Sequence, residues 1–88
     1  MSWEVYILRC GDGSLYTGIT NRFEIRLAAH RDGRGARYTR GRGPLEVVYR
    51  EPCRDRGDAS RRELEIKRLP TAGKWALARG GGGAPPVD

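Results

Sequence analysis

Two apolar runs near the start of the chain have the residue content of β-strands. Residues 3–9 (WEVYILR) and 15–20 (LYTGIT) are rich in β-branched and aromatic side chains, and residues 11–14 (GDGS) between them are turn formers. Two runs of this kind on either side of an Asp-Gly pair are typical of a tight hairpin. The pattern therefore predicts that the chain begins with a β-hairpin.

The length of the turn decides which side chains of this hairpin share a face. Successive side chains alternate between the two faces of a strand, so a two-residue turn would place Tyr6 and Tyr16 on opposite faces. A three-residue turn over residues 11–13 places both tyrosines on one face, with Gly18 opposite Tyr6. Gly13 suits the left-handed backbone that ends such a turn. We therefore predict the three-residue turn, with Gly13 at positive φ.

The segment after the hairpin, residues 21–30 (NRFEIRLAAH), has the spacing of a short amphipathic helix. Phe23 and Leu27 form an apolar pair one turn apart, and Arg26 and His30 form a second pair on the neighbouring row. Arg26 and His30 therefore flank the apolar stripe and reach the edge of whatever it packs against. The plainer alternative is a surface arginine, and a histidine that ends the helix near its negative pole.

Residues 31–43 (RDGRGARYTRGRG) contain four glycines and five arginines and do not predict a regular element. We expect a mobile basic loop. In such a loop Arg34, Arg37 and Arg40 bind phosphates and Tyr38 stacks on a base. A solvated linker is the alternative reading of the same composition.

The rest of the chain predicts the remaining elements of one α+β domain. They are a strand over residues 44–51 that starts at Pro44, a turn at 52–57, a helix to about residue 69, a short helix at 71–79 and a disordered Gly/Pro tail at 80–88. We therefore expect a domain over residues 1–79 with a three-stranded antiparallel sheet flanked by two or three helices. The first helix has Thr20 or Asn21 as its expected cap, and the second has Asp58 or Ser60.

Glu63 has an unusual place on the second expected helix. Ala59, Ile66 and Leu69 mark the inner stripe of this helix, and Glu63 falls at the margin of that stripe. A carboxylate beside a buried face needs a partner. Lys67, one turn further on, is the plain candidate, and a metal ion is the alternative.

Composition and charge indicate which kind of molecule the domain binds. The chain has 88 residues, a formal net charge of +6 and a pI near 10.0, which favours a polyanionic partner, most often nucleic acid. Most of the basic residues are arginines rather than lysines, and a GC-rich genome is the alternative explanation for this excess.

Cys10 and Cys53 lack zinc-ligand spacing and are expected to be free thiols in a reducing compartment. With neither a signal peptide nor an apolar run long enough to span a membrane, we expect a cytoplasmic monomer.

Several of these segments, in this order and spacing, resemble motifs of the GIY-YIG nuclease superfamily, and most closely its small stand-alone bacterial members. The segments are Val5-Tyr6-Ile7-Leu8, Tyr16-Thr17-Gly18-Ile19-Thr20, the pair Arg26 and His30, Tyr38-Thr39-Arg40-Gly41, and Ala59-Ser60-Arg61-Arg62-Glu63 followed by Ile66-Lys67. Together they cover residues 3 to about 77. Neither family motif is present in its literal form. Many larger relatives carry a lysine at the place of Ile19 and an asparagine beyond the metal-binding helix, and this chain has neither.

The resemblance implies a divalent-metal-dependent endonuclease that hydrolyses phosphodiester bonds in nucleic acid. We expect DNA before RNA as the substrate, and DNA repair as the process. Glu63 would hold one Mg²⁺ or Mn²⁺ ion, and Arg26 would stabilise charge on the phosphate. Tyr6 and Tyr16 would bind the phosphate or activate water, and His30 is the alternative base. The expected nucleic-acid contacts are Gly18, Arg34, Arg37, Tyr38, Arg40 and Lys67. A nucleic-acid-binding module that does not cut, and a small interaction protein, remain the alternatives.

Overall fold

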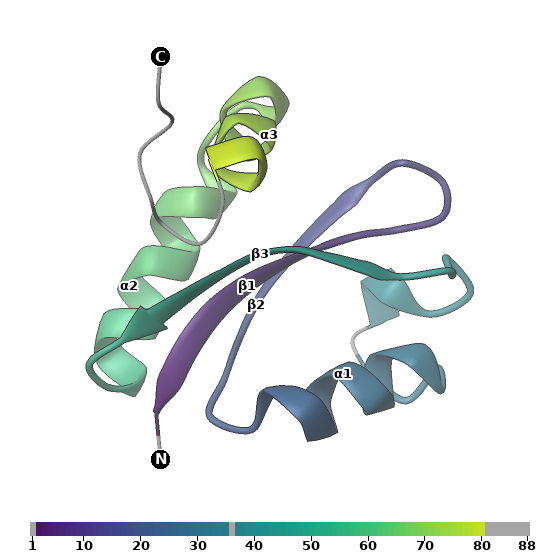
Figure 1. Cartoon of the computed structure of the whole chain (residues 1–88), viewed down its shortest axis with the longest axis horizontal. Helices are drawn as coiled ribbons and strands as arrows, with labels where there is room; N and C mark the ends of the chain where they lie inside the picture. The colour runs from purple at the N-terminus through teal and green to yellow at the C-terminus, as the bar shows by residue number, and fades with distance from the viewer. Residues whose placement is uncertain (1, 36, 81–88) are drawn as a thin grey trace.

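The computed structural model describes residues 2–35 and 37–80, without the side chain of Arg37. In chain order the elements are β1 (Trp3–Arg9), β2 (Leu15–Thr20), α1 (Phe23–Arg31), the single 3-10 turn η1 (Arg37–Thr39), β3 (Glu46–Cys53), α2 (Arg56–Lys67) and α3 (Thr71–Gly80). The strands form one antiparallel sheet in the order β2-β1-β3. Figure 1 shows α1 on one side of this sheet and α2 and α3 on the other. The predicted α+β fold is confirmed.

The hairpin has the predicted three-residue turn. The N–H of Cys10 donates to the carbonyl of Ser14 over 2.8 Å, and the N–H of Gly13 donates back to the carbonyl of Cys10 over 2.9 Å. Gly13 has a φ of 87°, which is the left-handed conformation that glycine adopts without strain. Tyr6 pairs with Gly18 across the two strands. The predicted register is therefore confirmed, and it places Tyr6 and Tyr16 on one face.

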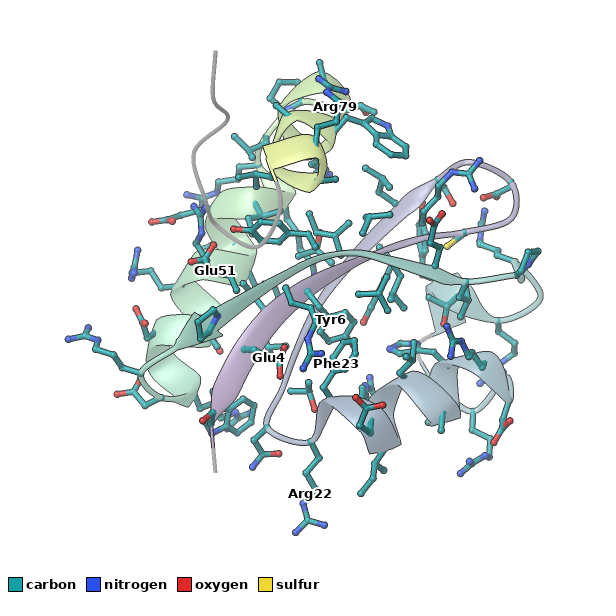
Figure 2. The ribbon with its side chains drawn as sticks, in the orientation of Figure 1. Glu4, Tyr6, Arg22, Phe23, Glu51 and Arg79 are labelled. Atoms are coloured by element: carbon teal, nitrogen blue, oxygen red, sulfur yellow. The ribbon has the colours of Figure 1, made fainter. Side chains whose placement is uncertain are left out.

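The sheet separates two clusters of buried side chains. The cluster on the side of α1 contains Tyr6, Leu8, Cys10, Phe23, Leu27 and Leu45, and Figure 2 shows Tyr6 and Phe23 between the sheet and α1. The cluster on the side of α2 and α3 contains Val5, Ile7, Tyr49 and Ile66. Alternate residues of β1 supply the two clusters. The central strand is therefore buried on both faces, and its side chains fix the position of both helical layers.

The third strand lies two residues further along the chain than the sequence predicts. It runs over Glu46–Cys53 rather than residues 44–51, so Pro52 belongs to the strand and not to a turn. Because β3 is an edge strand, a residue without an N–H is tolerated on it. A bulge between Ile7 and Leu8 shifts the pairing of β1 with β3 by one residue.

The predicted helix caps are wrong at both helices. The first residue of α2 is Arg56, and the carboxylate of Asp55 accepts the N–H of Asp58 over 2.8 Å. The cap position of α1 is Arg22, which makes no side-chain capping bond, and the hydroxyl of Thr20 accepts the N–H of Arg22 over 2.9 Å. α2 therefore has an aspartate cap three residues before the predicted Asp58, and α1 begins without a side-chain cap.

Part of the basic segment at residues 31–43 is regular, which the sequence did not predict. Residues 37–39 form the 3-10 turn η1, and Thr39 in this turn is buried.

Cys10 and Cys53 are free thiols, as predicted. Gly80 ends α3, and residues 81–88 of the predicted tail lie outside the described residues. In the part of the chain that the structure describes, no helix is long and apolar enough to cross a membrane.

Candidate active site

Tyr6 and Tyr16 meet on the face of the sheet that α1 covers. Their ring centroids are 6.3 Å apart. Gly18 lies between them, and a Cβ atom at this position would come within 2.6 Å of the Tyr6 hydroxyl oxygen and 3.0 Å of the Tyr16 ring. The glycine therefore makes room for the two tyrosines themselves. The approach of nucleic acid to Gly18 stays a prediction.

His30 joins the two tyrosines from the last turn of α1. Its Nε2 atom lies 2.8 Å from the Tyr6 hydroxyl oxygen, and its ring centroid is 5.2 Å from that of Tyr16. Its Nδ1 atom lies 2.8 Å from the hydroxyl oxygen of Thr39 in η1. His30 is only 2% exposed, so it is part of the buried cluster as well as lying in the last turn of α1.

Arg26, one turn before His30 on α1, contacts both tyrosines. Burial by itself would lower the pKa of this guanidinium, but its hydrogen bonds and charge interactions with Tyr6 and Tyr16 raise the pKa above its usual value. The structure thus brings together four of the five predicted catalytic residues by direct contact. They are Tyr6, Tyr16, Arg26 and His30.

The environment also fixes the protonation states at neutral pH. Burial raises the pKa of Tyr6 to about 12, the charges of Tyr16 and Glu63 add to this rise, and Arg26 opposes it. Burial lowers the pKa of His30, and the charge of Arg26 lowers it further. Tyr6 is therefore a phenol and His30 a neutral imidazole near pH 7.

Glu63 lies at the margin of the buried face of α2, as the helical spacing predicts. Ala59 and Ile66 on that face are fully buried, whereas the side chain of Glu63 is 24% exposed and pairs with Lys67 over 3.2 Å. Its charge raises the pKa of Tyr6, so the carboxylate lies within electrostatic range of the cluster. The plain partner of Glu63 is therefore present, and a metal ion at this carboxylate stays a prediction.

A divalent cation fits this donor chemistry if most of its ligands are not protein atoms. Among the described residues, no group of three or more His, Cys, Asp or Glu side chains could hold a metal ion. A hard cation of the Mg²⁺ type binds through one or two carboxylates and completes its shell with water and phosphate oxygens. Glu63, partly exposed and acidic, is a suitable single carboxylate for such an ion.

The predicted nucleic-acid residues of the basic segment are spread over the surface. Arg34 and Arg40 are exposed, and Arg34 forms an ion pair with Asp32 over 2.8 Å. The side chain of Arg37 lies outside the described part of the structure. Tyr38 is 42% exposed, and its ring centroid is 5.9 Å from that of Tyr16. Tyr38 thus extends the aromatic cluster of the site to the solvent.

The sequence suggested no functional role for two residues that lie near the site. Thr39 is 2% exposed and contacts His30, but a threonine in a Gly/Arg-rich segment gives no signal of burial. Arg42 lies over the ring of Tyr38, with its guanidinium carbon 4.6 Å from the ring centroid, and pairs with Asp12 of the hairpin turn. The arginine pattern contains Arg42 but does not distinguish it from its neighbours.

Comparisons with known proteins agree with this geometry. The family model of the GIY-YIG catalytic domain matches residues 2–74. A UPF0213 protein of Desulfotalea psychrophila is 51% identical over 79 residues, which is 89% of this chain and 72% of the relative. A UPF0213 protein of Nitratidesulfovibrio vulgaris is 55% identical over 83 residues, which is 93% of this chain and 76% of the relative.

Solved structures of similar sequence share the fold. The solution NMR structure of a UPF0213 protein from Bacillus halodurans has a TM-score of 0.60 and 43% identity, and the match covers 94% of this chain and 88% of that one. A solution NMR structure of a protein from E. faecalis has a TM-score of 0.61 and 34% identity, with 90% and 85% covered. The GIY-YIG domain is in general a nuclease domain, and nucleases are hydrolases. The chain belongs to the GIY-YIG catalytic domain family, within its UPF0213 group of small bacterial proteins.

Proposed function

We propose that this protein is a divalent-metal-dependent endonuclease that hydrolyses phosphodiester bonds in nucleic acid, with DNA as its substrate. The observation that carries the proposal is that Tyr6, Tyr16 and His30 meet on one face of the sheet, with Arg26 close enough to interact with both tyrosines. Phosphodiester hydrolysis requires positive charge at the phosphate and an oriented water molecule. A guanidinium beside two phenols supplies both requirements in one place.

Arg26 and Glu63 have separate roles in neutralising the negative charge at the phosphate. Arg26 stays protonated at any working pH and presents a forked set of donors that matches two phosphate oxygens. It stabilises the charge that builds on the phosphate as water attacks. Glu63 would hold one Mg²⁺ or Mn²⁺ ion, and such an ion, when bound, supplies further charge neutralisation at the phosphate.

Burial distinguishes the three candidate bases. His30 is 2% exposed, with a hydrogen-bond partner at each ring nitrogen, and Tyr6 is 1% exposed. Neither side chain meets bulk water, and the raised pKa of Tyr6 keeps it protonated. Tyr16 is partly exposed and contacts Arg26. In this proposal Tyr16 orients the attacking water, while Tyr6 and His30 hold Arg26 in place.

The exposed residues next to the site bind the substrate. Tyr38 offers a partly exposed ring beside Tyr16, on which a base stacks. Arg34, Arg37 and Arg40 are the phosphate contacts, in keeping with the net charge of +6. DNA as the substrate, a role in DNA repair and a cytoplasmic, monomeric protein are parts of the same proposal.

One observation favours a second function, a nucleic-acid-binding module without catalysis. The ion pair between Glu63 and Lys67 satisfies the carboxylate without a metal ion. If this pair persists when divalent metal and DNA are present, the basic surface and Tyr38 still bind nucleic acid, but no cation reaches the phosphate.

The test is a cleavage screen over single-stranded, duplex, flap and branched DNA and RNA, with Mg²⁺ and with Mn²⁺. Glu63→Gln keeps the shape of the side chain and removes its charge, so it abolishes cleavage while folding and nucleic-acid binding remain. Glu65→Gln is the matched control, because Glu65 is on the same helix and pairs with Arg61 over 2.6 Å at the surface. This control variant cuts at the wild-type rate.

The outcomes separate the two functions. Wild-type protein that binds DNA but cuts none of these substrates with either metal would establish the binding module. A Glu63→Gln variant that cuts like wild type would show that the metal site is misassigned. A folded Glu63→Gln variant that binds but does not cut supports the endonuclease.

A further inference from the structure

Thr39 is the residue of the basic segment that lies deepest in the molecule and closest to the site. It is 2% exposed, and its hydroxyl oxygen lies 2.8 Å from Nδ1 of His30. Gly35 packs against the same ring so closely that a Cβ atom there would overlap the imidazole. Gly35 and Thr39 therefore both lie against one edge of His30, and Tyr6 occupies the other edge.

Tyr6, His30 and Thr39 form a chain of hydrogen bonds. The donor-only guanidinium of Arg26 beside Tyr6 determines which atom donates in each bond. A neutral imidazole has one N–H donor and one bare nitrogen that accepts. The guanidinium of Arg26 is a donor only, and its interaction with Tyr6 lowers the pKa of that phenol, so the phenol oxygen turns a lone pair toward Arg26. Tyr6 keeps its own proton for Nε2 of His30, 2.8 Å away. Nε2 must then be bare, and the proton of His30 lies on Nδ1, from which it is donated to Thr39.

The opposite tautomer would disrupt the contact between Tyr6 and Arg26. With the proton on Nε2, His30 would donate to the Tyr6 oxygen, and the phenol would have to turn its own proton elsewhere. The side chain on its other side is Arg26, which offers only donors. Donor would face donor, and the guanidinium would lose one of the two hydroxyls that hold it.

We propose that Thr39 is a positioning residue whose hydroxyl oxygen accepts the Nδ1–H of His30, stabilises that tautomer and, through His30 and Tyr6, supports Arg26 in the orientation that binds phosphate. The effect on cleavage rests on the proposed nuclease function. The effect on the tautomer of His30 does not, and it can be measured without substrate.

The first measurement is a long-range ¹H–¹⁵N correlation spectrum of the imidazole in ¹⁵N-labelled full-length protein near pH 7. The chain contains a single histidine, so the spectrum reports His30 alone. The wild-type spectrum shows a protonated Nδ1 and a bare Nε2. A wild-type spectrum with the proton on Nε2 overturns the proposal without any variant.

Two variants of Thr39 separate the role of its hydroxyl from that of its shape. Thr39→Val keeps the branched shape and removes the acceptor, so the spectrum of His30 shifts toward a mixture of the two tautomers. Thr39→Ser keeps the hydroxyl and restores the wild-type spectrum. In the cleavage assay, Thr39→Val lowers kcat about tenfold with KM near the wild-type value, as is typical of a lost supporting hydrogen bond, and Thr39→Ser recovers kcat.

The cleavage assay and the tautomer spectra test the two proposals separately. If the wild-type protein cuts nothing, the nuclease proposal fails, while the tautomer spectra still decide whether Thr39 fixes His30. If Thr39→Val keeps a pure Nδ1–H spectrum, Thr39 does not set the tautomer. If Thr39→Val and Thr39→Ser lower kcat equally, the shape of the side chain matters and not its hydroxyl, which contradicts the proposal.

Discussion

Replacement of Gly18 by alanine tests the packing on which the site depends. The added Cβ atom would lie 2.6 Å from the hydroxyl oxygen of Tyr6 and 2.8 Å from its Cζ atom, well inside van der Waals contact. Tyr6 is buried on all sides and holds His30 through its hydroxyl. The ring of Tyr6 must therefore shift away, and its hydrogen bond to His30 breaks or lengthens.

The cost can be worked from these contacts. Overpacking of a filled core costs about 1–3 kcal/mol, and loss of a neutral hydrogen bond adds about 0.5–1.5 kcal/mol. A glycine replaced by alanine regains about 0.4–1 kcal/mol, because the unfolded chain becomes less flexible. We expect Gly18→Ala to lower the free energy of unfolding by about 2 kcal/mol, which corresponds to a fall in Tm of about 10 °C for a domain of this size.

Urea denaturation and thermal unfolding followed by circular dichroism measure this loss. Gly57→Ala is the matched control, because Gly57 lies in the first turn of α2 and a Cβ atom there meets nothing closer than 3.5 Å. The control variant is at least as stable as wild type. A Gly18→Ala protein with wild-type stability would refute the reasoning, because Tyr6 would then have room that the structure does not show.

Two further predictions follow from the charges. Because the pKa of Tyr6 is raised to about 12 from an ordinary value of 10.0, the folded state keeps this proton where the unfolded state loses it. The resulting stability is fully present below pH 10 and falls as pH rises toward 12, by roughly 3 kcal/mol. Urea midpoints across this range check it, and Tyr6→Phe should remove this part of the fall. Combined replacement of Arg34, Arg37 and Arg40 by alanine should flatten the salt dependence of DNA binding by about 0.7–0.9 per lost phosphate contact, and an unchanged slope would mean that the segment is only a linker.

The parts of the fold that depend on local sequence could be predicted. The hairpin register was predicted from the turn residues, because Gly13 suits the left-handed position that ends a three-residue turn, and the structure has that turn. The place of Glu63 at the margin of α2 follows from helical periodicity. Both depend on residues close together in the chain, so no tertiary information was needed.

The features that depend on distant contacts could not be predicted. The turn η1 contains the buried Thr39, which contacts His30 nine positions earlier in the chain. The bounds of β3 follow from pairing with β1, 37 to 50 residues away along the chain, so Pro52 falls inside the strand. The start of α2 was also missed, because Asp55 and Asp58 are both suitable caps and the local sequence does not choose between them.

The order of the strands has a consequence for how the chain folds during synthesis. The central strand β1 comes first in the chain, and its two partners are made at different times. The hairpin with β2 is complete once residue 20 has been made, whereas the other edge of β1 waits for Glu46–Cys53. Until then a row of backbone N–H and C=O groups on an apolar strand has no partner, and such an open edge is prone to pair with another chain. The newly made chain is therefore most vulnerable to aggregation before β3 leaves the ribosome and closes that edge.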